Sequence, residues 1–150
     1  IRLSDLYLMY AEAANETKAA PDADVYEYIQ KVRDRAGLDE GSDLVSTWQM
    51  HSSNPSKPTT KDGMREIIHQ ERMIELALEG HRYWDLRRWK LAGEYFSKPI
   101  RGWNIFKPDV EGFYEVENIF YRNYLTKDYL WPISQTELLR NPNLIQNPGW

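Results

Sequence analysis

Apolar positions in the first 36 residues recur every three or four residues, which is the spacing of one face of an α-helix. One stripe lies within residues 1–16 and a second within residues 22–36. Asp22 stands where a helix N-cap is expected, and Gly37 stands where a helix ends. The pattern predicts two amphipathic helices packed as an antiparallel hairpin, the unit of tetratricopeptide solenoids. The two stripes consist of Leu3, Leu6, Tyr7, Tyr10, Ala13 and Ala14, then Val25, Tyr28, Ile29, Val32 and Ala36.

The sequence in the middle of the chain predicts a loop followed by the longest helix. Residues 39–58 are polar and rich in Ser, Asn and Pro, which is typical of a long loop. Thr59 begins a capping-box pattern and opens a helix that extends to about Glu79. Gly80 predicts a break, after which a further helix continues to about Gly93.

The C-terminal third predicts irregular chain with few regular elements. One small β-hairpin is expected, in which residues 113–117 pair with residues 119–125. A short helix begins at a capping box at Ser134 and ends before Pro142. The side chains of Gln146 and Asn147 are expected to bond backbone groups that no regular element satisfies. The fold class is therefore mainly α: a tetratricopeptide-like helical hairpin, a long helix, and a loop-rich C-terminal part with a small β-hairpin.

Two carboxylates fall within the apolar stripe of the long helix. At about 100° per residue, Glu71 and Glu75 share a face with Ile67, Ile74 and Leu78. An ionised acid in that place must be paired, because burying it alone costs more than folding supplies. Nearby arginines and Asp85 predict a structural charge network. Its expected members are Glu71, Arg72, Glu75, Arg82, Asp85 and Arg88.

Two catalytic or metal-binding alternatives use the same helix. Glu71 and Glu75 at i, i+4 lie about 5 to 6 Å apart, close to the roughly 5 Å separation in retaining glycosidases. Those enzymes need their acids on opposite sides of an open cleft, so the structural interpretation is preferred and no catalytic residue is predicted. Glu66 and His69 resemble one half of a di-iron motif, which requires two such copies. No metal and no cofactor are therefore expected.

Composition limits the remaining classes of function. The net charge of −4 and the lack of a basic stripe argue against nucleic-acid binding. No apolar run approaches the roughly 20 residues of a membrane-spanning helix. Without Cys there is neither a disulfide framework nor a thiolate metal site. Aromatic residues are the surplus, with six Trp and ten Tyr.

The aromatic residues divide into a helical and a loop group. Trp84 and Trp89 have helical spacing around Asp85, which favours packing in the core. The loop group lies among Pro, Gly, Asn and Ser, where no stripe requires it. Flat aromatic faces suit the C–H face of a pyranose, and Arg and Asn can bond its hydroxyls. The carbohydrate-binding candidates are Trp48, Arg101, Trp103, Asn104 and Phe106.

Four segments, in this order, resemble the C-terminal region of SusD/RagB family proteins: YLMYAEAANE, VRDRAGL, ERMIELALEGHRYWDLRRWK and YLWPISQTELLRNPNLIQNPGW. The resemblance implies a surface-exposed lipoprotein of the Gram-negative outer membrane with tetratricopeptide-like helix pairs. Such proteins bind polysaccharide or oligosaccharide and cover a SusC-like, TonB-dependent transporter that imports it, without catalysis.

The resemblance also implies that residues 1–150 form a single C-terminal domain, with the N-terminal half and the lipid anchor upstream. The membrane would then be reached only through that anchor. The alternative function is a protein-interaction module, in which the helical hairpin and the apolar loops bind a protein partner without direct glycan binding.

Overall fold

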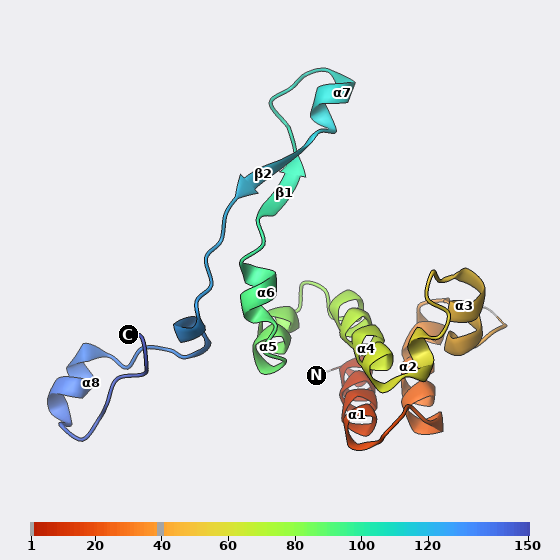
Figure 1. Cartoon of the computed structure of the whole chain (residues 1–150), viewed down its shortest axis with the longest axis horizontal. Helices are drawn as coiled ribbons and strands as arrows, with labels where there is room; N and C mark the ends of the chain where they lie inside the picture. The colour runs from red at the N-terminus through yellow and green to blue at the C-terminus, as the bar shows by residue number, and fades with distance from the viewer. Residues whose placement is uncertain (1, 39–40) are drawn as a thin grey trace. The chain divides into compact units, whose positions relative to one another are not determined.

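Helices form most of the chain, as the pattern predicts (Figure 1). The computed structural model describes residues 2–38 and 41–150. It divides the chain into two compact units, residues 1–82 and residues 83–150. None of the helices in these described stretches combines the length and apolar character needed to cross a membrane.

The predicted helical hairpin is confirmed. Helix α1 (Leu3–Thr17) packs against α2 (Ala23–Arg35) in the first unit (Figure 1). The Asp22 carboxylate accepts a hydrogen bond from the backbone N–H of Val25, so it caps α2 as expected. Gly37 has a φ of +72°, the left-handed conformation that ends a helix after its last turn.

The buried face of α1 differs from the predicted stripe. Leu3, Leu6 and Tyr10 are about half exposed, whereas Leu8 and Ala11 are fully buried. Polar side chains also lie on this buried face, because they form hydrogen bonds or ion pairs with the long helix over residues 61–75, which packs against α1. These buried polar residues are Ser4, Asp5 and Asn15. Hydrophobic periodicity missed this face because polar residues occupy part of it.

The predicted loop over residues 39–58 is wrong in its middle. Helix α3 (Leu44–His51) lies within it, followed by the 3₁₀ turn η1 (Lys57–Thr59). Asp43 caps α3 by accepting from the N–H of Ser46 at 2.8 Å. Ser and Thr inside α3 have weak helix propensity, so local composition concealed the helix. Residues 39 and 40 lie outside the described residues.

The long helix is shorter than predicted. Helix α4 (Lys61–Glu75) is capped by Thr60, whose hydroxyl accepts from the N–H of Gly63 at 3.1 Å, and not by the predicted Thr59. The chain turns after Glu75, and Leu78 adopts a φ of +66°. Leu78 therefore leaves the apolar stripe and is exposed. Ile74 lies in the last turn of α4 and is exposed as well, at 59%.

The core of the first unit is formed by four helices. Apolar side chains of α1, α2, α3 and α4 meet in one buried cluster, and Trp48 packs against its edge. The buried members are Ala11, Val25, Ile29, Leu44, Met64, Ile67 and Ile68.

The second unit is built from shorter elements. The helix predicted to reach Gly93 ends at Arg88, and Lys90 has a φ of +61° where the chain turns. The boundary between the two units lies after Arg82, in the first turn of α5 (His81–Arg88). The elements are α5 (His81–Arg88), α6 (Ala92–Phe96), β1 (Ile100–Trp103), α7 (Val110–Phe113), β2 (Val116–Phe120), η2 (Thr126–Tyr129) and α8 (Gln135–Arg140).

A β-hairpin is present, but its strands differ from those predicted. Strand β1 pairs antiparallel with β2, so that Trp103 lies opposite Val116 and Arg101 opposite Asn118. Phe113 belongs to α7 and not to a strand. The strand β1 was missed because its short sequence, with a central glycine, lacks the alternation of a half-buried strand.

The C-terminal segment is held by side-chain bonds to backbone, as predicted. Gln146 accepts from the N–H of Ile133 at 2.8 Å and donates to its carbonyl at 3.0 Å. Asn147 donates to the carbonyl of Trp131 at 2.6 Å. Helix α8 lies after Ser134 and ends before Pro142, although Ser134 makes no side-chain cap.

Candidate functional site

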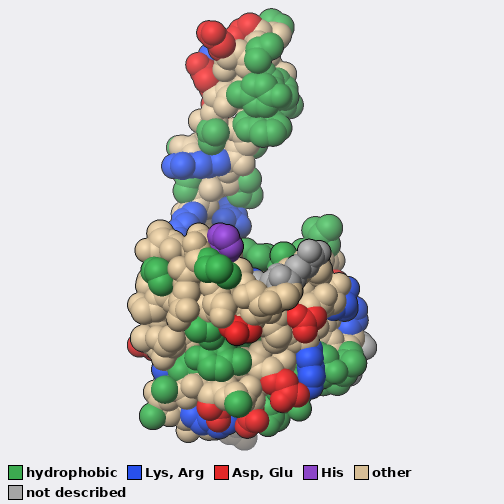
Figure 2. Space-filling view, turned by 90° about the vertical axis from the view of Figure 1, so that its right-hand side faces the viewer, with side chains coloured by type: hydrophobic (Ala, Val, Ile, Leu, Met, Phe, Trp, Pro, Cys, Tyr) green, Lys and Arg blue, Asp and Glu red, His purple; other side chains and the backbone are tan. Residues whose placement is uncertain are grey.

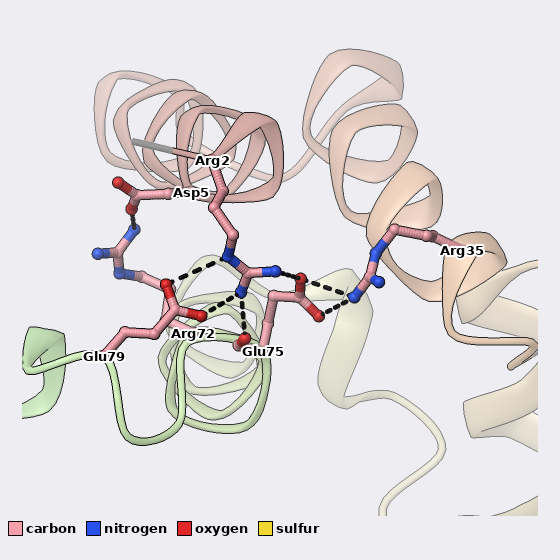
Figure 3. Close-up of polar contacts among 6 residues, drawn as sticks. All are labelled: Arg2, Asp5, Arg35, Arg72, Glu75 and Glu79. Carbon is pink, nitrogen blue, oxygen red and sulfur yellow. Dashed lines mark hydrogen bonds and ion pairs between the residues drawn. The ribbon is translucent and has the colours of Figure 1, made fainter.

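A charge network joins three helices of the first unit (Figure 3). Arg72 of α4 donates to Asp5 of α1 at 3.1 Å, and both side chains are more than 90% buried. Arg35 of α2 makes two bonds to the Glu75 carboxylate, at 2.7 and 2.6 Å. Arg2 reaches Glu75 at 3.2 Å as well. These ion pairs connect α1, α2 and α4 to one another.

The arginines that pair with Glu71 and Glu75 lie in a different part of the chain from the one that the sequence suggested. Glu71 pairs with Arg33 of α2, and Glu75 pairs with Arg35 of the same helix. Sequence reasoning looked for partners next to α4, because spacing along one helix says nothing about a neighbouring helix. Further along, Asp85 accepts from Arg88 at 2.9 Å within α5.

The electrostatics of Glu75 are those of a structural carboxylate. Burial opposes its ionisation, but hydrogen bonds from Ser4 and Arg35 and the charges of Arg35 and Arg2 outweigh it, so its pKa lies below the ordinary value. A glycosidase general acid needs a raised pKa. The geometry therefore gives Glu75 the properties of an ion-pair partner.

The Glu66 and His69 pair has no metal-site surroundings. Glu66 pairs with Lys57 at 2.8 Å, so its carboxylate already has a cationic partner. Across the described stretches of chain, no cluster of three or more His, Cys, Asp or Glu side chains could hold a metal ion.

An aromatic face lies at the end of the β-hairpin, where Trp103 is 57% exposed. The Trp103 ring lies 5.9 Å from that of Phe113 and 5.2 Å from that of Tyr114, centroid to centroid. Figure 2 shows hydrophobic side chains gathered on one face of the hairpin, at the top of the view. We call Trp103, Phe113 and Tyr114 the hairpin aromatic face. Sequence reasoning missed Phe113 and Tyr114, because it assigned residues 113–117 to a strand. The adjacent pair of aromatic residues was the available signal.

The other hairpin candidates have different surroundings. Asn104 is buried, and its amide donates to Glu117 at 2.6 Å while its oxygen accepts from the N–H of Phe106 at 3.2 Å. Asn104 therefore shapes the turn after β1. Arg101 is exposed and donates to Asn118 across the strands at 3.2 Å. Phe106 is 90% exposed and follows the turn that Asn104 holds.

Trp48 belongs to the first unit and lines a hollow. Its ring is half-buried, and Lys57 Nζ lies 5.4 Å from the ring centroid. The hollow has a volume of about 540 Å³. We call it the Trp48 hollow, and it is lined by Trp48, Ser52, Ser53, Asn54, Ser56, Lys57, Thr60, Gly63 and Glu66.

Trp84 in α5 and Trp89 directly after it do not both lie in the core. Trp84 is 59% exposed, so the prediction that it packs in the core is wrong. The buried side of α5 is formed by Asp85 and Leu86, which leaves Trp84 on the opposite side. Trp89 is half-buried under the Arg88 guanidinium, whose carbon lies 4.8 Å from the ring centroid.

Arg87 connects two elements of the second unit. Its guanidinium donates to the Tyr124 hydroxyl at 3.2 Å and to the backbone carbonyls of Asp128 and Tyr129. These bonds tie α5 to η2 within the second unit, so Arg87 has a structural role there.

Comparison with known proteins gives one consistent result. The sequence model of the SusD family matches residues 1–150. SusD-like protein P2 of Formosa agariphila is 36% identical over 151 residues, covering 100% of this chain and 25% of that protein. A SusD-like protein from Bacteroides fragilis has a solved structure that is 31% identical with a TM-score of 0.74, covering 100% of this chain and 25% of that one.

A second solved structure from Bacteroides fragilis is described as a SusD-like carbohydrate binding protein. It is 32% identical to this chain with a TM-score of 0.71, and the match covers 97% of this chain and 28% of the other. The chain thus spans about a quarter of the length of the relatives it matches.

Proposed function

Because the chain belongs to the SusD family, we propose that it takes part in non-catalytic capture of glycan at the cell surface. In this proposal the protein lies at the outer membrane of a Gram-negative cell and delivers polysaccharide or oligosaccharide to a SusC-like, TonB-dependent transporter. The observation that carries the proposal is the similarity of nearly the whole chain to a protein described as carbohydrate binding.

The hairpin aromatic face supports the proposal on physical grounds. A pyranose presents an apolar face of C–H groups, which packs well on an exposed ring such as that of Trp103. Arg101, at the other end of β1, is exposed and carries donors that suit sugar hydroxyls. Phe106 adds a second exposed ring close in the chain. We therefore propose Trp103, Tyr114, Phe106 and Arg101 as glycan contacts, with Asn104 holding the turn.

The ion pairs of α4 support the non-catalytic part of the proposal. Both candidate carboxylates, Glu71 and Glu75, are engaged by arginines of α2. Retaining hydrolysis needs one carboxylate free to attack and a second with a raised pKa. Both side chains are held in ion pairs, and the pKa of Glu75 is lowered instead of raised.

Affinity electrophoresis tests the glycan proposal. The chain is run through gels that contain amylopectin, xylan, galactomannan, laminarin or alginate, beside Trp103→Ala and Trp131→Ala. Trp131 is 66% exposed and serves as the matched control, since it also is an exposed tryptophan of the second unit. We expect at least one polysaccharide to slow the chain, and Trp103→Ala to weaken binding roughly fivefold, because one ring contact contributes about 1 kcal/mol.

Trp131→Ala should be slowed as much as the unaltered chain. Migration unaffected by every polysaccharide would contradict the proposed glycan binding. Equal retardation of all three proteins would contradict the proposed contact with Trp103.

A further inference from the structure

The Trp48 hollow has the size of a ligand site. Its volume of about 540 Å³ lies within the range of roughly 300 to 1,000 Å³ of small-molecule pockets. Its walls come from α3, from the segment between α3 and η1, and from the first turns of α4. All of these elements belong to the first unit, whereas the hairpin aromatic face belongs to the second.

Hydrogen bonds fix the rim of the hollow. The N–H of Asn54 donates to the Ser52 hydroxyl at 3.0 Å, and the Ser56 hydroxyl donates to Asn54 at 3.1 Å. At the start of α4, a Cβ on Gly63 would lie 2.1 Å from the carbonyl oxygen of Lys57. Only glycine permits this close approach of α4 to η1, so the hollow has a defined shape.

The lining combines an aromatic ring with neutral polar groups. Hydroxyl and amide groups of the 52–56 segment offer both donors and acceptors. The two charged lining residues, Lys57 and Glu66, neutralise each other at 2.8 Å. An anionic ligand would meet the Glu66 carboxylate, and a cationic ligand would meet the Lys57 ammonium. The chemistry therefore matches an uncharged ligand with several hydroxyls and one apolar face.

We infer that the Trp48 hollow is a second sugar-binding site, which takes a single neutral pyranose unit of a glycan. The inference rests on the glycan binding proposed above and adds a site that is separate from the hairpin. Trp48 supplies the wall for the C–H face of the ring, and the surrounding Ser and Asn groups bond its hydroxyls.

Titration of a labelled chain tests this inference. The ¹⁵N-labelled Trp103→Ala chain, which lacks the hairpin contact, is titrated with glucose, galactose, mannose or xylose, and with glucuronate for comparison. We expect at least one neutral sugar to shift the Trp48 indole and the amides of residues 52–57 saturably, and glucuronate to bind at least tenfold more weakly.

A blocking variant and its control decide the location. Ser53→Tyr places a ring into the hollow from an exposed position, while Gln49→Tyr adds the same ring at an exposed position of α3 that does not line it. Sugar-dependent shifts that vanish in Ser53→Tyr and persist in Gln49→Tyr support the site. Shifts that persist in Ser53→Tyr, or that no neutral sugar produces, overturn it.

The two proposals fail independently. Polysaccharide retardation that Trp103→Ala weakens upholds the proposed function even when the Trp48 hollow binds no sugar. If Trp103→Ala and Trp131→Ala are both retarded as much as the unaltered chain, and sugar shifts the Trp48 resonance, the hairpin site is ruled out and the Trp48 hollow remains.

Discussion

Glu75 is nearly buried and is held by arginines from two segments of the chain. Its side chain is 9% exposed, and it contacts Arg35 of α2 and Arg2 before α1. Burial raises the pKa of a carboxyl group, yet these partners hold it below the ordinary value of 4.5. The ionised form of Glu75 is therefore bound more tightly in the folded state than in the unfolded state.

This pKa shift predicts a defined dependence of stability on pH. A carboxyl whose folded pKa is depressed stabilises the fold above its unfolded pKa and loses that contribution as pH falls through the folded value. Relative to Glu75→Gln, the unaltered chain should be more stable at about pH 7, and the difference should shrink below about pH 4.5. Urea unfolding of both proteins across this range measures it. A difference that stays constant with pH would contradict the assigned ion pairs.

At the scale of elements, the Asp5–Arg72 pair ties α1 to α4. Both side chains are more than 90% buried, so the pair is shielded from water. Removing one member of a buried pair leaves the other charge poorly compensated, which costs roughly 3 to 5 kcal/mol. Asp5→Ala should therefore lower the free energy of unfolding by about 3 kcal/mol, measured by urea titration followed by circular dichroism.

A solvent-exposed pair in the same unit provides the control. Glu27 and Lys31 of α2 lie 2.6 Å apart and are 57% and 40% exposed. Glu27→Ala should cost less than about 1 kcal/mol, because water screens such pairs. Equal effects of the two substitutions would show that Asp5 has no special role in joining the helices.

The elements differ in how far the sequence predicts them. Helices α1, α2 and α4 carry long apolar periods, and Asp22 and Gly37 mark the limits of α2. Helix α3 was missed because it is short and lies within a polar segment. Strand β1 was missed because pairing depends on β2, more than ten residues further on, and no local signal contains that contact.

At the scale of the whole molecule, the candidate site was only partly predictable. The sequence identified Trp48 and Trp103 as aromatic residues outside any stripe, and the structure places the first beside a hollow and the second on an exposed face. It could not separate Asn104, which is buried in a turn, from residues open to a ligand. That distinction depends on tertiary contacts with Glu117, which composition does not contain. The chain divides into two compact units. This division does not test the expectation of a single C-terminal domain, which stays a prediction.

The six tryptophans allow one measurement to test the central claim, which is glycan binding through the hairpin aromatic face. Each has an indole N–H whose resonance is followed while the unaltered ¹⁵N-labelled chain is titrated with an oligosaccharide of the polysaccharide that retards it most. We expect a saturable shift for Trp103. Trp84 and Trp131, which are similarly exposed, and Trp150, whose indole bonds the carbonyls of Lys127 and Leu130, should not respond. An unchanged Trp103 resonance at saturating sugar would contradict glycan binding through the hairpin aromatic face, as would equal shifts of all the exposed tryptophans.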